Sequence, residues 1–149
     1  MKTEILFPEV ANLCGDLMNV TYLRQCCPEM EVVETGLKDR PAFLDGGVDL
    51  AYVGSATERG LQLMVKALAP YRAELERYVD GGGLMLATGN ALDALGEYVV
   101  IDGKRAFDGL GILKTHAEYH MMKRHNSFLL GSFQDMEIVG FKSLFGHTY

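Results

Sequence analysis

Residues 84–90 read Leu84-Met85-Leu86-Ala87-Thr88-Gly89-Asn90, an apolar run followed by a turn of small residues. Glycines occupy positions 81–83 just before the run, and the residues after the turn favour a short helix that ends at Leu95. A nearly all-apolar run of this length is typical of a central parallel strand that is buried on both faces. The stretch therefore predicts a strand, a tight turn and a helix, the repeating unit of α/β proteins.

The sequence before this stretch alternates between strand-like and helix-like segments. The strand-like segments are residues 2–7, 31–34 and 49–54, and the helix-like segments are residues 11–26, capped by Asn12, and 58–79, broken at Pro70. This alternation predicts a three-layer α/β fold with a flavodoxin-like parallel sheet. After Gly96, strand-like segments at 98–101, 128–130 and 136–141 predict an added, partly antiparallel C-terminal region. Because no linker-like stretch divides the chain, we expect residues 1–149 to form a single domain.

Composition narrows the range of partners. The chain carries a formal net charge of −6, which disfavours nucleic acid and anionic membranes as main partners because both attract Lys and Arg. No apolar run approaches the roughly 20 residues of a membrane span, and the N-terminus does not resemble a signal peptide. We therefore expect a cytoplasmic protein. The three cysteines, Cys14, Cys26 and Cys27, have neither a disulfide pattern nor zinc spacing, and no metal or cofactor is expected.

Two strand ends are candidates for chemistry. In an open parallel sheet, ligands bind beyond the carboxyl ends of the strands. The turn at Thr88, between a buried strand and a helix, has the pattern of a nucleophile elbow, and a helix N-terminus favours developing negative charge. The segment Val53-Gly54-Ser55-Ala56 could supply backbone N–H groups to an oxyanion hole. A plain strand-to-helix turn without catalytic function is the alternative.

Five segments match, in order and in spacing, motifs of one enzyme family. They are Asn12-Leu13-Cys14-Gly15-Asp16-Leu17-Met18-Asn19 with Arg24 after it, Tyr52-Val53-Gly54-Ser55-Ala56-Thr57-Glu58-Arg59, Leu86-Ala87-Thr88-Gly89-Asn90-Ala91-Leu92-Asp93-Ala94-Leu95-Gly96, Gly109-Leu110-Gly111-Ile112-Leu113, and Gly140-Phe141 with Gly146 and Thr148. In these segments the chain resembles the CobB/CobQ-like class I glutamine amidotransferases. It is most similar to the amidotransferase subunit of lipid II isoglutaminyl synthase.

The resemblance implies a reaction and a partner. In the family a cysteine thiolate attacks the side-chain amide of glutamine, a thioester forms, and ammonia passes to an ATP-dependent synthetase, here a Mur-ligase-like subunit. The implied setting is cell-wall or cobalamin biosynthesis. Thr88 stands at the nucleophile position, Gly54, Ser55 and Ala56 at the oxyanion strand, and Gly89 and Asn90 in the elbow. Asp16, Glu58 and Arg59 match positions beside the family's active cleft, although surface solvation explains such charged residues equally well.

Four departures from the family bear on catalysis. Thr88 replaces the cysteine, and an alcohol needs a strong, well-placed base where a thiol ionises readily. Ser55 and Ala56 replace glycines, so side chains crowd the oxyanion strand. Leu144 replaces a motif histidine, and His147 follows three residues later. The family pattern also continues past the position of Tyr149 and places its catalytic histidine there, so the chain is either a fragment of such a domain or a short version of it.

Other reactive side chains have simpler explanations. Cys14 near a helix start could be a nucleophile, but a partly buried structural thiol is the expectation. His116, Glu118 and His120 would share one face of a strand and could bind a metal. Their spread over roughly 13 Å favours a solvated polar face instead. The segment Lys123-Arg124-His125 is expected to form a polar turn.

Three functions follow from these observations. The favoured one is an amidotransferase-like domain that has lost its nucleophile and acts as a ligand-binding or partner-binding subunit. The second is an active enzyme of altered chemistry, which uses either Thr88 as a weak nucleophile or Ser55 and Thr57 as polar ligands for another substrate. It requires a general base beside the Thr88 hydroxyl. The third is a purely structural subunit, which would have an exposed apolar patch and no pocket at the strand ends.

Overall fold

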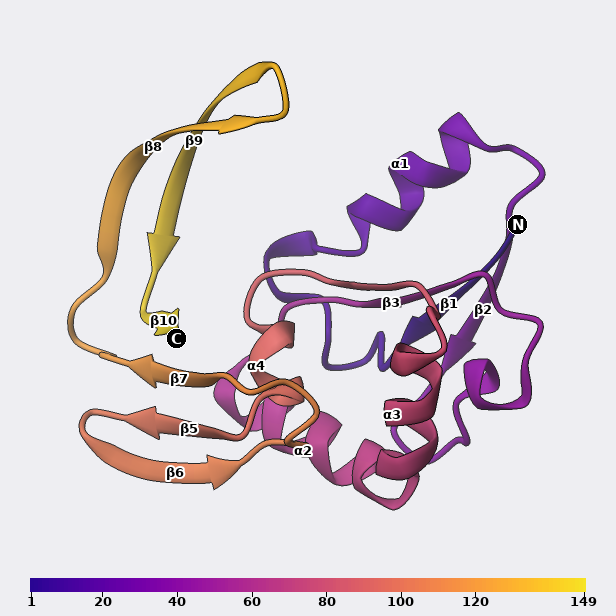
Figure 1. The fold of residues 1–149 in the computed structure, drawn as a ribbon, viewed down its shortest axis with the longest axis horizontal. Helices are drawn as coiled ribbons and strands as arrows, with labels where there is room; N and C mark the ends of the chain where they lie inside the picture. Colours follow the sequence, from indigo (N-terminus) through magenta and orange to yellow (C-terminus); the bar gives the residue numbers. More distant parts are fainter.

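The computed structural model describes residues 1–149 and has an α/β fold built on a four-stranded parallel sheet (Figure 1). The strands of this sheet are β1 (Lys2–Leu6), β2 (Glu31–Thr35), β3 (Leu50–Val53) and β4 (Met85–Ala87). Their order in space is β2-β1-β3-β4, and every neighbouring pair is parallel. The prediction of an α/β fold with a parallel sheet is therefore confirmed.

Helices cover both faces of this sheet. They are α1 (Met18–Cys26), α2 (Glu58–Leu68), α3 (Arg72–Asp80) and α4 (Ala91–Leu95), with short 3₁₀ turns η1 (Leu13–Gly15), η2 (Ala42–Asp45) and η3 (Ala69–Tyr71). On one face, Val20 of α1 packs against Ile5 and Tyr52. On the other face, the main core joins side chains such as Leu6 and Leu61. Since side chains alternate along a strand, adjacent residues of β1 serve the two cores.

The break predicted at Pro70 is confirmed. Helix α2 ends at Leu68, η3 contains the proline, and α3 begins at Arg72. Proline has no N–H to donate and clashes with the preceding turn, so the helix changes direction there. The start of α2 is fixed by Thr57, whose hydroxyl accepts a hydrogen bond from the Gly60 N–H at 3.1 Å.

A buried carboxylate ties the first strand to the η2 turn. Glu4 in β1 is fully buried and accepts hydrogen bonds from the N–H groups of Ala42 at 2.6 Å and Phe43 at 2.7 Å. The hydroxyl of Thr35 donates a further hydrogen bond to it. A buried charge needs such partners, so this cluster holds the loop after β2 against the sheet.

The C-terminal third forms two further sheets. One contains β5 (Tyr98–Ile101), β6 (Lys104–Asp108), β7 (His116–Tyr119) and β10 (Gly146–Thr148), in the order β10-β7-β5-β6. Its β5–β7 pair is parallel and its other pairs are antiparallel. The other sheet is the hairpin of β8 (His125–Phe133) and β9 (Met136–Leu144), which projects from the rest of the molecule in Figure 1. A partly antiparallel region was predicted here, and β6 and β10 are additions to that prediction.

The prediction that residues 84–87 form a central strand buried on both faces is wrong. Strand β4 lies at the edge of the sheet, and Leu84 and Leu86 are 65% and 39% exposed. After β4 the chain turns through α4 into the second sheet, so no strand pairs with its outer edge. An apolar run indicates what a strand could bury, but a flanking strand and the helices packed on both faces must be present to bury it.

The predicted helix 11–26 is shorter than expected. Residues 13–15 form the η1 turn, and Cys14 has the left-handed φ of +58°. The Asn12 side chain does not cap a helix but accepts a hydrogen bond from the Leu17 N–H at 2.9 Å. Leu13, inside the predicted helix, is 43% exposed in the η1 turn. The helix begins only at Met18, and the loop before it is free to reach the ends of the other strands.

Candidate functional site

The loops after β1, β3 and β4 meet at the carboxyl edge of the parallel sheet. Gly54 follows β3, and a Cβ atom there would lie 2.1 Å from the Ala11 carbonyl oxygen. Gly89 follows β4 with a φ of +54°, and a Cβ atom there would lie 2.7 Å from the Ser55 Cβ. Both positions therefore require glycine, because the three loops are pressed together.

Thr88 is held by one group from the loop after β1 and one from strand β3. Its hydroxyl donates a hydrogen bond to Asp16 Oδ2 at 2.6 Å and lies 3.2 Å from the hydroxyl of Tyr52. The left-handed backbone conformation of this turn is at Gly89 and not at Thr88. The Thr88 hydroxyl is therefore directed into the protein, toward the Asp16 carboxylate.

The Asp16 carboxylate links these loops. Its Oδ2 also accepts a hydrogen bond from the Ser55 N–H at 2.6 Å, and its Oδ1 accepts one from the Asn19 amide at 2.9 Å. Burial alone would raise the pKa of Asp16, but the hydrogen bonds from the Ser55 N–H, the Thr88 hydroxyl and the Asn19 amide together lower this pKa below its ordinary value. Asp16 is therefore an ionised acceptor whose lone pairs are largely in use.

Ala56, the next residue of the oxyanion strand, forms a reciprocal pair of hydrogen bonds with the Asn90 side chain. The Ala56 N–H donates to Asn90 Oδ1 at 3.0 Å, and Asn90 Nδ2 donates to the Ala56 carbonyl oxygen at 2.8 Å. This reciprocal pair joins the start of α2 to the start of α4. The two N–H groups considered for an oxyanion hole, those of Ser55 and Ala56, thus both have acceptors within the chain.

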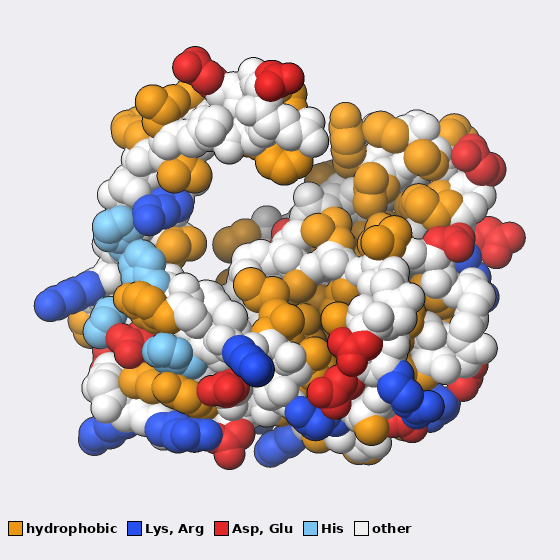
Figure 2. Space-filling view, in the orientation of Figure 1, with side chains coloured by type: hydrophobic (Ala, Val, Ile, Leu, Met, Phe, Trp, Pro, Cys, Tyr) orange, Lys and Arg blue, Asp and Glu red, His pale blue; other side chains and the backbone are white.

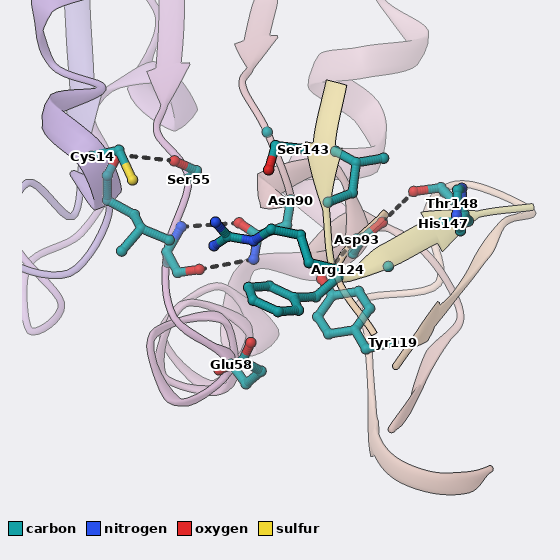
Figure 3. A pocket seen from close by; sticks show the side chains of 16 residues that line it. Cys14, Ser55, Glu58, Asn90, Asp93, Tyr119, Arg124, Ser143, His147 and Thr148 are labelled. Carbon is teal, nitrogen blue, oxygen red and sulfur yellow. Dashed lines mark hydrogen bonds between the residues drawn. The ribbon is translucent and has the colours of Figure 1, made fainter. Parts of the chain in front are cut away.

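A cavity of about 430 Å³ opens beside these turns (Figure 3). The strand ends and the first turn of α2 line one side of it with Ser55, Ala56, Glu58, Gly89 and Asn90. The second sheet and the segments next to it line the other side with Asp93, Tyr119, Arg124, His147 and Thr148. The cavity therefore lies between the parallel sheet and the C-terminal region.

Asp93 organises the floor of this cavity. It is buried in α4 and accepts hydrogen bonds from the Tyr119 hydroxyl at 2.5 Å and the Thr148 hydroxyl at 2.7 Å. Burial and the hydrogen bond to Asp93 raise the pKa of Tyr119 far above its ordinary value, so its hydroxyl remains a donor. These bonds attach β7 and β10 to α4 and fix the wall of the cavity.

Arg124 brings a positive charge to the cavity. Its guanidinium lies over the Phe145 ring, 4.5 Å from the centroid, and forms no ion pair within the chain. Glu58 supplies a carboxylate from the first turn of α2. The His147 ring, which also lines the cavity, lies 5.2 Å from that of His125. The cavity thus offers a fixed cation, a carboxylate and an imidazole to a polar ligand.

Several residues expected at the site line the cavity, and others lie outside its lining. Ser55, Ala56, Glu58, Gly89 and Asn90 line it. Asp16, Gly54 and Thr88 belong to the adjoining hydrogen-bond cluster or its backbone, and Arg59 is exposed on α2 outside the lining.

The sequence prediction missed most of one side of the cavity. Asp93 and Tyr119 were not among the predicted site residues, and Arg124 was assigned only to a polar turn. The one signal in the sequence was Asp93, a single carboxylate within the apolar pattern of α4. A buried carboxylate needs hydrogen-bond partners, so its presence indicated that another segment packs against this helix. Nothing near Tyr119 or Arg124 in the sequence indicates that the C-terminal region folds back over the strand ends.

The other candidates have different surroundings from those expected. Cys14 lines the cavity as an exposed free thiol, so the expectation of a partly buried one is wrong. His116 stacks between Tyr98 and Tyr149 with ring centroids at 5.0 and 5.5 Å, and it lies 3.7 Å from Glu118. His120 lies beyond the end of β7, and no group of three His, Cys, Asp or Glu side chains is arranged to hold a metal ion. His125 begins β8 instead of completing a polar turn.

No protein-family model matches the chain, and no curated protein matches it in sequence.

None of the helices has the combination of length and apolar character needed to cross a bilayer.

Proposed function

We propose that this chain is a flavodoxin-like, class I amidotransferase-like domain that binds a small polar ligand at its strand ends and does not hydrolyse glutamine. The strand order β2-β1-β3-β4 agrees with the first four positions of the flavodoxin-like order. The loops that carry Asp16, Ser55 and Thr88 meet where β1 and β3 send the chain to opposite sides, which is where such folds bind ligands.

The observation that carries this proposal is the internal use of the catalytic positions. An oxyanion hole needs N–H groups free to meet the negative charge that develops in the transition state. Here the Ser55 N–H donates to Asp16 and the Ala56 N–H donates to Asn90. Thr88, at the nucleophile position, also donates to Asp16. Glutamine hydrolysis would require all three bonds to break, so the arrangement favours binding without turnover.

The cavity supports a ligand of amino-acid size. A volume of about 430 Å³ falls within the usual range for small-molecule sites. Arg124 can pair with a carboxylate and Glu58 with an ammonium group, so an α-amino acid such as glutamine or glutamate fits this chemistry. A purely structural subunit was expected to have an exposed apolar patch and no pocket at the strand ends. The β8–β9 hairpin carries such a patch, but the cavity counts against this alternative.

A specific contact favours one alternative, an active enzyme of altered chemistry. Asp16 Oδ2 lies 2.6 Å from the Thr88 hydroxyl, within the reach required of a general base. The lowered pKa of Asp16 makes it a weak base at neutral pH, because general bases work best with a pKa near the operating pH. The contact is therefore better suited to holding Thr88 in place than to activating it.

In this proposal the domain keeps the family's association with an ATP-dependent synthetase. A Mur-ligase-like subunit is the partner that the resemblance implies, and the domain would hold the ligand or complete the fold of that partner. Co-expression with such a ligase, followed by co-purification, tests this part separately from the chemistry.

The test of the function combines turnover and binding. Purified protein is incubated with glutamine, ammonia release is measured, and calorimetry with glutamine and glutamate measures binding. We expect no ammonia above the buffer control and a binding isotherm that is lost in Arg124→Ala. Exposed Arg59→Ala on α2 is the matched control and should bind as the unchanged protein does. Ammonia release that disappears in Thr88→Ala would establish the active alternative.

A further inference from the structure

The β8–β9 hairpin exposes apolar side chains on both of its faces. Nine large apolar side chains of the hairpin are between 37% and 84% exposed, and none of its residues is buried. They are Phe128, Leu129, Leu130, Phe133, Met136, Ile138, Val139, Phe141 and Leu144. The hairpin pairs with no other strand, and Figure 2 shows open space between it and the rest of the molecule. An isolated two-stranded hairpin is marginally stable in water, and large exposed apolar surfaces mark sites of interaction. We therefore expect a partner to cover at least one face of the hairpin.

One face of the hairpin is more apolar and more exposed than the other. Phe128 pairs with Phe141 and Leu130 with Val139, so these four side chains share one face, which we call the aromatic face. They are 62–84% exposed, and the two phenyl rings lie 5.6 Å apart in an edge-to-face arrangement. The opposite face is interrupted by Gly131 and Gly140 and is less exposed. The aromatic face is therefore the continuous apolar surface.

The size of this face suits a symmetric interface. Its four side chains expose roughly 500 Å² of apolar surface, taking about 150–250 Å² for a large side chain. A standard interface buries about 800 Å² on each partner, and the polar residues flanking the aromatic face supply the remainder. Two copies of this face would thus bury enough area for a stable dimer.

Charge is divided along the hairpin. Asp135 and Glu137 lie at the tip, while Lys123 and Arg124 lie just before the base of β8. Figure 2 shows acidic side chains at the tip and basic ones nearer the base. None of these four residues forms an ion pair within the chain. A second hairpin running in the opposite direction would place each acidic tip over a basic base.

We propose that two copies of this chain associate through the aromatic faces of their hairpins, antiparallel and about a two-fold axis. A two-fold axis through the middle of the hairpin places the Phe128–Phe141 row of one copy over the Leu130–Val139 row of the other. It also places Asp135 of each copy near Lys123 of the other. The base of the hairpin also borders the cavity through Arg124 and Leu144, but the four residues of the aromatic face lie outside the cavity lining, so this inference does not rest on the proposed function.

The first test is the oligomeric state. Sedimentation equilibrium of the unchanged protein at micromolar concentration should give a mass of about 33 kDa, twice the 16.5 kDa of one chain. Leu130→Lys should weaken the dimer by about 30-fold, because it places a charge in the centre of the interface. Met18→Lys, on an α1 side chain that is 67% exposed, is the matched control and should leave the dimer intact. Circular dichroism verifies that both variants fold.

A charge exchange tests the antiparallel arrangement. Asp135→Lys and Lys123→Asp should each weaken the dimer by about 5-fold, and the double variant should recover to within about 2-fold. Along one hairpin these residues are separated by roughly 35 Å, beyond the Debye length, so recovery must arise between copies. Lys104→Asp on β6 serves as the charge control. A monomer at every concentration, or a dimer that Leu130→Lys leaves unchanged, would overturn the proposal, and failed recovery would overturn the antiparallel alignment.

Discussion

The parallel-sheet half of the molecule and the β8–β9 hairpin use apolar residues in opposite ways. In the first, side chains such as Leu6, Leu61 and Leu75 are completely buried and fix the loops that carry Asp16 and Thr88. In the second, side chains of the same kind face outward and no residue is buried. The site is therefore held in place by the core of this chain, whereas in our proposal the hairpin is stabilised by a second copy of the chain.

The largest expected effect contrasts one core residue with one hairpin residue. Leu61→Ala should lower the free energy of unfolding by about 2–5 kcal/mol, because it removes a fully buried side chain and leaves a cavity. Val139→Ala, at a position 75% exposed, should change the free energy of unfolding of the monomer by less than about 0.5 kcal/mol. Urea denaturation measures both. Equal losses in the two variants would mean that the hairpin is part of the core.

The buried carboxylate of Glu4 gives the next largest effect. Glu4→Ala should cost about 2–4 kcal/mol, because the N–H groups of Ala42 and Phe43 lose a charged acceptor in a buried site. Exposed Glu31→Ala in β2 is the control and should cost little. Thermal unfolding followed by circular dichroism makes the comparison, and a loss of equal size in the control would contradict the role of Glu4.

Glycines distinguish the two regions in the same way. Gly89→Ala should cost about 1–3 kcal/mol, because the residue has a positive φ and its Cβ would meet the Ser55 Cβ at 2.7 Å. In the hairpin, a Cβ atom added at Gly131 would have no atom within 4 Å, and the residue has no positive φ. Gly131→Ala should therefore leave the free energy of unfolding nearly unchanged. Urea midpoints of the two variants provide the measurement. A neutral Gly89→Ala would show that the strand-end loops are not tightly packed.

The smallest expected effect is a pH dependence. The pKa of Asp16 is lower in the folded protein than its ordinary value of 3.8, so its contribution to stability is present above that pH and is lost as pH falls through the lower folded pKa. Asp16→Asn should therefore be less stable than the unchanged protein at pH 6, and the difference should shrink below about pH 4. Denaturation across this pH range tests the sign, and a difference that grows toward acid would contradict it.

The sequence was sufficient to predict the parallel sheet, because its strands and helices have clear local patterns. The alternation up to Leu95 and the break at Pro70 are examples. It did not predict that β4 lies at an edge, since burial depends on a neighbouring strand as well as on the strand itself. The two strands of the hairpin were also recognisable as strand-like segments. The sequence did not indicate that they form a sheet of their own, separate from the other two.

The candidate site was predicted only in part, for a related reason. Small residues at the strand ends identified Ser55 and Gly89 as site residues, and both line the cavity. The pairing of Asp16 with Thr88, and the approach of Arg124 to the same edge, join residues far apart in the chain. Such contacts come from the tertiary fold and leave no periodic signal in the sequence. The flavodoxin-like arrangement and the amidotransferase resemblance stay predictions.

We propose that the Thr88 turn is closed to glutamine hydrolysis because the Thr88 hydroxyl and the neighbouring Ser55 and Ala56 N–H groups are bound within the chain. The most direct measurement is glutamine-dependent ammonia release by the unchanged protein, Thr88→Ala and Thr88→Cys, compared side by side. We predict no release from any of the three, because a thiol alone would leave the Ser55 and Ala56 N–H groups bound to Asp16 and Asn90. Release by the unchanged protein that is lost in Thr88→Ala, or release gained in Thr88→Cys, would contradict the claim.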